Sequence, residues 1–185
     1  MANAPPIRDR LIIEAARLFA ERGYHGVGVA EVLEAARAPK GSLYHHFPAG
    51  KSDLALAAAA WASDGMLRMA EDAYASAPDF DAGTRHLCAK LAKLFDQLGR
   101  WTGCPVSSIL FEGPANRAFH DEGARIFEAW IDAIAKHGMR LGLQSETARR
   151  RAEAIWIGVQ GAWTLARARA DAAPLLTVPD LVQGA

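Results

Sequence analysis

The sequence predicts an all-helical protein, with a three-helix head in its N-terminal part and a larger helical body after it. No segment alternates apolar and polar residues, as a half-buried strand would. Apolar residues instead recur at helical spacing, as Leu11, Ala15 and Leu18 do on one face of the first segment. Glycine or proline stands near most of the expected helix ends. These observations favour the all-α class, with domains at 1–48 and 49–185.

The head is expected to hold three short helices. The first runs over about 7–22 and ends at Gly23, and the second runs over about 29–36. Pro39 suits the first position of the third helix, because a missing N–H costs little there. This third helix should end near Phe47. The spacing of the three segments is that of a helix-turn-helix unit.

The body is expected to hold five further helices and a tail. Gly138 should end one of them, and Ser145 suits the N-cap of the next. The tail from residue 171 has at most one turn of helix, near Pro179. The expected body helices run over about 51–76, 81–99, 105–112, 116–137 and 146–170.

The third helix of the head carries side chains that suit a DNA groove better than a core. Leu43 and Phe47 lie four residues apart and should pack inward, which leaves the polar residues between them on the outer face. The first turn offers free backbone N–H groups to phosphate, and Gly41 lets the backbone approach closely. His45 and His46 point about 100° apart, so they are not expected to chelate a metal together. The candidate DNA-binding residues are Arg37, Lys40, Gly41, Ser42, Tyr44, His45, His46 and Lys51.

Charge is distributed in a way that agrees with local contact to phosphates. The whole chain has a net charge of zero, which argues against a generally basic coat. Residues 1–51 hold seven Lys/Arg and five Asp/Glu, whereas the remainder holds 14 and 16. A slightly basic head on a slightly acidic body suits a local DNA contact and weak non-specific binding.

Two motifs give the chain a resemblance to a known family. The first is Ala15-Ala16…Leu18-Phe19…Gly23-Tyr24, and the second is Lys40-Gly41-Ser42-Leu43-Tyr44-His45-His46-Phe47. Over about 45 residues they resemble the TetR/AcrR family of bacterial transcriptional regulators. The run Phe47-Pro48-Ala49-Gly50-Lys51 and the later Gly103-Cys104-Pro105-Val106 resemble its LmrA/YxaF-like branch. The chain departs from the family at Val27 and Gly28, where no hydroxyl caps the second helix, and at Arg37 and Pro39.

The resemblance implies a homodimeric repressor that binds a palindromic double-stranded DNA operator and is released by a small apolar or amphipathic effector. The large side chains of the body suit such an effector, although plain core packing explains each of them as well. Small residues beside Trp156 and Trp163 suggest a dimer seam on the helices expected at about 116–137 and 146–170, with a pure core as the alternative. The candidate effector residues are Trp61, Trp101, Cys104, Phe111, Phe127, Trp130 and Gln160; the candidate dimer residues are Trp156, Gly158, Val159, Gly161, Ala162 and Trp163.

Other function classes find less support in the sequence. No His-Glu-x-x-His, Glu-x-x-His or phosphate-loop motif is present, so no enzyme activity, metal or cofactor is expected. No apolar run reaches the length of about 18 residues that spans a membrane, and two cysteines make no disulfide framework. A cytoplasmic protein is therefore expected. Two alternatives stay open: a thiol-switched regulator that uses Cys104, and a helical lipid-binding protein or enzyme without a DNA role.

Overall fold

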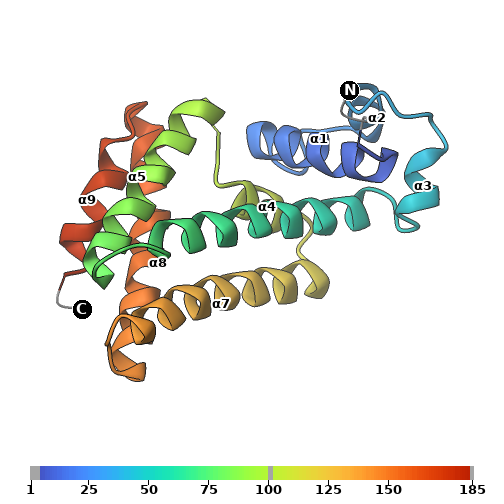
Figure 1. The fold of residues 1–185 in the computed structure, drawn as a ribbon. Coiled ribbons are helices and arrows are strands. Elements are labelled where there is room, and N and C mark those ends of the chain that lie inside the picture. Colours follow the sequence, from blue (N-terminus) through green and yellow to red (C-terminus); the bar gives the residue numbers. More distant parts are fainter. Residues whose placement is uncertain (1–4, 100–101, 184–185) are drawn as a thin grey trace. The chain divides into compact units, whose positions relative to one another are not determined.

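The computed structural model describes residues 5–99 and 102–183, and this part of the chain is all-helical, as predicted. Figure 1 shows its helices in chain order, joined by short connections. No described helix is long and apolar enough to cross a membrane. The helices are α1 (Ile7–Arg22), α2 (Val29–Ala35), α3 (Ser42–His46), α4 (Lys51–Tyr74), α5 (Phe80–Leu98), α6 (Pro105–Leu110), α7 (Arg117–Arg140), α8 (Ser145–Arg169) and α9 (Ala173–Leu181).

The chain divides into two compact units that differ from the predicted domains. The first consists of Met1–Asp64 with Cys104–Ala124, and the second of Gly65–Gly103 with Arg125–Ala185. The first unit therefore combines the helix-turn-helix segment with α6 and the start of α7. The functional boundary after residue 48 stays a prediction.

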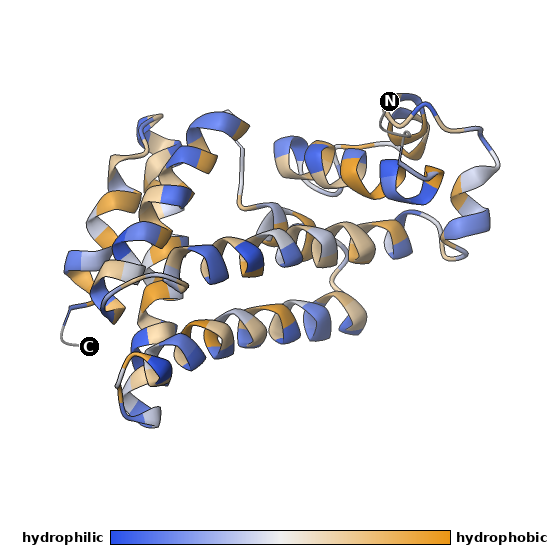
Figure 2. Cartoon of the chain, in the orientation of Figure 1, coloured by the Kyte–Doolittle hydropathy of each residue, from blue (hydrophilic) through white to orange (hydrophobic). Residues whose placement is uncertain are grey.

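The first unit is built around α1, which packs against α2, α3 and α6. One face of α1 is buried, and Leu11 and Phe19 on it are completely covered. Leu43 of α3 is equally buried, so the predicted inward anchor of this helix is confirmed. Figure 2 shows that hydrophobic and hydrophilic residues alternate along α1, as expected for a helix with one buried face. Burial of this apolar stripe is what fixes α3 on the rest of the head.

The turn between α2 and α3 holds Arg37 in the left-handed region, at φ 49°. Glycine favours this conformation, and a residue with a Cβ pays for it in steric strain. Arg10 of α1 secures the turn, because its guanidinium donates to the carbonyls of Ala36 at 3.0 Å and Arg37 at 3.3 Å. The family departure at Arg37 thus keeps the turn and adds a cation to it.

The third helix begins later than the sequence predicted. Pro39 is not its first residue; it lies in a preceding turn closed by the bond from the Ser42 N–H to the Pro39 carbonyl, at 3.0 Å. The helix proper is Ser42–His46. Its end matches the prediction, because Phe47 is the C-cap.

The second unit contains α5, α8 and α9, with the later parts of α4 and α7. Asp79 caps α5 by accepting from the Ala82 N–H at 2.7 Å. Tyr74 is completely buried, and its hydroxyl lies 2.8 Å from that of Thr84. α9 packs against α5 and α8, and the amphipathic pattern of these helices is visible in Figure 2.

Two predicted helix boundaries and the predicted tail in the second unit were wrong. Gly138 does not end α7; a Cβ there would lie 3.0 Å from Ala148 Cβ, so the missing side chain allows close helix packing inside the unit. Ser145 is the first residue of α8 rather than its cap. The expected tail contains a full helix, α9, because its apolar residues are buried on α5 and α8.

Candidate nucleic-acid interface and effector site

The outer face of α3 is polar and exposed, whereas its inner face is anchored in the core. Leu43 and Phe47 are buried, and Lys40 and His45 are exposed. Tyr44 is 65% exposed, which is unusual for so large an apolar ring. A short helix that is rigidly anchored on one side and presents donors on the other can enter a DNA groove.

The turn before α3 leaves the backbone open to close approach. Nothing lies within 4 Å of the position that a Cβ at Gly41 would take. The Ser42 hydroxyl donates to the Pro39 carbonyl at 2.6 Å, so its proton is engaged within the turn. Ser42 is therefore better placed to accept a hydrogen bond from a base or water than to donate one to phosphate.

Tyr44 braces the loop that follows α3. Gly50 has φ 69°, and a Cβ built on it would lie 3.2 Å from Tyr44 Cε1. A side chain at residue 50 would therefore meet both backbone strain and the tyrosine ring. This contact fixes the approach to α4, which begins at Lys51.

The two histidines lie side by side at the end of α3. The rings of His45 and His46 have centroids 4.8 Å apart and are nearly perpendicular. In the described ranges, no three His, Cys, Asp or Glu side chains are grouped so that they could hold a metal ion.

Lys51 lies over aromatic rings at the start of α4. Its Nζ is 4.2 Å from the centroid of the Tyr24 ring and 5.9 Å from that of Phe19. Partial burial lowers the pKa of Lys51, because burial disfavours the charged ammonium. The lysine is thus held near the helix-turn-helix segment and is not a freely solvated side chain.

Sequence reasoning missed Arg8, a further cation beside α3. Its guanidinium carbon lies 5.5 Å from the centroid of the Phe47 ring, and the residue is exposed. The two residues are far apart in the sequence, so no local pattern could have paired them. Arg8 places an exposed positive charge next to the C-cap residue of α3, Phe47.

The predicted effector residues are distributed over both units. In the first unit Trp61 and Phe111 are exposed, and Cys104 is buried. In the second unit Trp130 is completely buried, and its ring centroid lies 4.9 Å from that of Phe127. Gln160, also in the second unit, is half-buried, and Trp101 lies outside the described residues.

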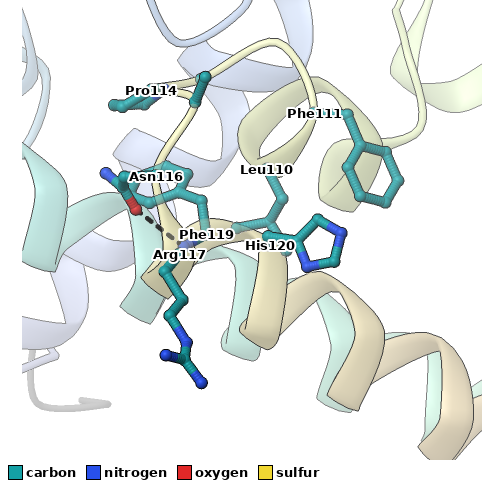
Figure 3. A pocket seen from close by; sticks show the side chains of 9 residues that line it. Leu110, Phe111, Pro114, Asn116, Arg117, Phe119 and His120 are labelled. Atoms are coloured by element: carbon teal, nitrogen blue, oxygen red, sulfur yellow. Dashed lines mark hydrogen bonds between the residues drawn. The ribbon is translucent and has the colours of Figure 1, made fainter.

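One hollow lies within the first unit, at the connection between α6 and α7. It has a volume of about 410 Å³. Figure 3 shows the Phe111 ring and His120 at the same side of the hollow, whereas the Arg117 side chain extends away from the hollow. Phe111 is 59% exposed. The lining is mainly apolar and consists of Leu110, Phe111, Gly113, Pro114, Ala115, Asn116, Arg117, Phe119 and His120.

Most of the predicted dimer residues lie inside the protomer. Trp156 and Trp163 are 3% and 4% exposed, and Val159 and Ala162 are buried as well. A Cβ at Gly158 would lie 3.0 Å from Val178 Cγ1 of α9, so this glycine faces the same protomer. Gly161, by contrast, is exposed and has open space around it. These residues build the core of the second unit, with Gly161 on its outer surface.

The two tryptophans of α8 differ in their polar contacts. The Trp163 indole N–H donates to the Thr102 carbonyl at 3.1 Å. The indole nitrogen of Trp156 is buried without a hydrogen-bond partner among the described residues, and its ring lies 4.7 Å from that of Trp130. An unsatisfied buried donor costs about 1–3 kcal/mol of stability.

Both cysteines are buried thiols. Burial raises the pKa of Cys88 to about 12, which keeps it protonated and unreactive. Cys104 is the N-cap residue of α6, and its side chain makes no capping hydrogen bond.

Two family models match the chain. The model described as bacterial regulatory proteins, TetR family, matches residues 11–58. The model for the C-terminal domain of LmrA/YxaF-like transcriptional regulators matches residues 82–180, which is more than half of the chain.

Whole-chain comparisons agree with these matches. The uncharacterized HTH-type regulator YxaF of Bacillus subtilis is 27% identical, over 98% of this chain and 96% of its own. The crystal structure of a TetR regulatory protein from Rhodobacter sphaeroides is 27% identical, with a TM-score of 0.79, and covers 94% of this chain and 95% of its own. A mutant of the TetR-family regulator CifR, solved with 26-base-pair operator DNA, is 24% identical with a TM-score of 0.77, and covers 98% and 97%.

Proposed function

Because the chain belongs to the TetR family of bacterial transcriptional regulators, we propose that it is a repressor that a small molecule releases from DNA. In this proposal a homodimer binds a palindromic operator through one α3 helix from each copy. The observation that carries it is the geometry of α3, where buried Leu43 anchors a helix whose exposed face presents Lys40, Tyr44 and His45. CifR, which is similar in fold, has been solved on operator DNA, which supports an operator as the binding partner.

Different residues of this interface are assigned to positioning and to reading. Lys40, Lys51 and Arg8 bind phosphates, because an ammonium or guanidinium reaches the backbone of any sequence. Ser42, His45 and His46 meet base edges in the major groove. Gly41 allows the first turn of α3 to approach the DNA closely, Tyr44 supports the loop before α4, and Arg37 contacts phosphate from the turn.

The dimer is assigned to exposed apolar residues on α8 and α9 of the second unit, which we call the α8–α9 face and define as Ile157, Gly161, Leu165, Leu176 and Leu181. Ile157, Gly161 and Leu165 recur every four residues, so they share one side of α8. The four large members are all exposed in the single chain. Self-association would remove this apolar surface from water, as a twofold interface requires.

The effector is assigned to the hollow beside Phe111. Its mainly apolar lining suits a small apolar or amphipathic molecule, and its volume lies within the usual range of about 300–1,000 Å³ for ligand sites. By linkage, an effector that favours a DNA-incompetent arrangement must itself bind more weakly to the DNA-bound protein.

Selection of bound fragments from the source genome tests the function. We expect recovered fragments to share two inverted half-sites whose centres are about 34–36 Å, or a multiple of that distance, apart. An asymmetric site bound by a monomer would contradict the proposed repressor dimer. Recovery of no specific fragment would favour the lipid-binding or enzyme alternative.

A thiol switch at Cys104 is a separate candidate for the signal. It would be favoured if an oxidant changed DNA affinity in the native protein and not in Cys104→Ser. Burial of Cys104 speaks against this switch, because a thiol that reacts with an oxidant must be accessible to it.

A further inference from the structure

Lys51 lies over the Tyr24 ring, which packs against Phe19 and Phe119; we call these three rings the aromatic platform. DNA recognition by α3 does not itself require such a platform. The Lys51 ammonium lies 4.2 Å from the Tyr24 ring centroid, within the range of a cation–π contact. Tyr24 comes from the connection after α1, and Lys51 is the first residue of α4. The contact therefore fixes the position of a long, otherwise flexible side chain relative to the helix-turn-helix segment.

The Tyr24 ring is itself held from two sides. Phe19 lies 5.6 Å away in a tilted arrangement, and Phe119 lies 5.6 Å away with its ring nearly perpendicular, at 85°. Edge-to-face contacts of this kind contribute about 0.5–1.5 kcal/mol beyond the burial of the rings. Tyr24 is buried, so its ring has little freedom once Phe19 and Phe119 are in place.

Phe119 belongs to the first turn of α7 and lines the hollow shown in Figure 3. Its backbone N–H donates to the side-chain oxygen of Asn116 at 3.0 Å. A Cβ at Gly113 would lie 2.9 Å from Phe119 Cε1, so the loop and the ring are in close contact. A displacement of this loop must therefore displace the Phe119 ring.

We propose that Tyr24 is a positioning residue for Lys51 in DNA binding, and that Phe119 connects this platform to the α6–α7 hollow. The inference rests on the proposed function, and it names the route by which an occupant of the hollow changes DNA affinity. The ammonium has three N–H donors, so one face can stay on the ring while another donor meets a phosphate. Loss of the platform leaves the charge in place and removes its orientation.

A double-mutant cycle in DNA binding separates positioning from simple bracing of the head. Tyr24→Leu should weaken operator binding about two- to fivefold, as expected for a cation–π contact at a partly exposed site. Tyr24→Phe keeps the ring and should bind like the native protein. In a Lys51→Ala background, Tyr24→Leu should have no further effect, because the lysine through which it acts is gone. An equal loss in both backgrounds would overturn the proposal.

Proton NMR on the free protein gives a readout that does not depend on DNA. Ring currents of Tyr24 should shift the Lys51 ε-methylene protons upfield, and Tyr24→Phe should keep this shift even if Tyr24→Leu fails to fold. Phe119→Leu should reduce the shift, whereas the control Phe95→Leu should not. Phe95 is a suitable control because it is equally buried, contacts Trp163 edge-to-face at 5.5 Å, and lies in the second unit.

The outcomes are distinguishable from failure of the proposed function. Absence of an upfield shift at Lys51 would overturn the platform, and an unchanged shift in Phe119→Leu would overturn the connection to the hollow, whatever the protein does with DNA. If the shifts behave as expected and no operator is found, the platform stands as a structural feature and its role in DNA binding is overturned.

Discussion

Trp156 and Trp163 allow the cost of one buried hydrogen bond to be measured within a single helix. Both side chains are almost fully buried on α8, but only Trp163 donates its N–H to an acceptor, the Thr102 carbonyl at 3.1 Å. Replacement by phenylalanine removes the same ring volume and the same N–H group at each position. The packing loss is therefore similar, and the difference between the variants reports on the polar contact.

The expected difference follows from the two environments. Trp163→Phe leaves the Thr102 carbonyl without this donor, which should cost about 1–2 kcal/mol in addition to the packing loss. Trp156→Phe removes a donor that is already unsatisfied, which should offset its packing loss by a similar amount, about 1–2 kcal/mol. Trp163→Phe should thus be less stable than Trp156→Phe by about 2–4 kcal/mol in urea unfolding. Equal losses would refute the reasoning and indicate that the Trp156 N–H is satisfied in solution.

Three further predictions concern backbone strain, alkaline stability and assembly. Ala170 ends α8 at φ 50°, so Ala170→Gly should raise the free energy of unfolding by about 1 kcal/mol, whereas Ala168→Gly inside the last turn should lower it by about 1 kcal/mol. Burial raises the pKa of Cys88 from 9.0 to about 12, so the unfolded chain loses the thiol proton at a lower pH than the folded protein does. The free energy of unfolding should therefore fall as pH rises from 9 towards 12. Cys88→Ala should make this fall with pH less steep. Ile157→Glu should dissociate the dimer, as measured by light scattering, while helicity is retained. The control is Met139→Glu, which changes an exposed methionine outside the α8–α9 face and should leave the dimer intact. A dimeric Ile157→Glu protein would show that this face is not the interface.

Much of the fold could be predicted because local patterns carry it. The bounds of α1 follow from an apolar stripe and a terminal glycine, and both are as expected. Gly138 misled the prediction because glycine serves two purposes, to end a helix or to let two helices approach, and only the packing against Ala148 decides between them. The helix α9 was missed because its stability comes from burial on α5 and α8, which the sequence of the tail does not reveal.

The site was predictable to the extent that it is local. The anchors of α3 and its exposed polar face follow from helical spacing, and the structure places Leu43 and Tyr44 accordingly. The contact of Arg8 with Phe47 and that of Lys51 with Tyr24 join residues far apart in the chain, so spacing could not identify them. In α8, amphipathic spacing located a buried stripe, but the same stripe serves either a core or a dimer seam; tertiary packing places Trp156 and Trp163 in the core.

The central claim, that α3 reads DNA while Lys51 positions it, is tested most directly by measuring affinity for every single-base variant of the selected operator. For His45→Ala we expect lost discrimination at one or two positions in each half-site, with little change elsewhere. For Lys51→Ala we expect a uniform loss of affinity over all sequences and a salt dependence lower by about one phosphate contact. A uniform loss for His45→Ala, or an unchanged preference at every position, would contradict the assignment of α3 as the reading helix.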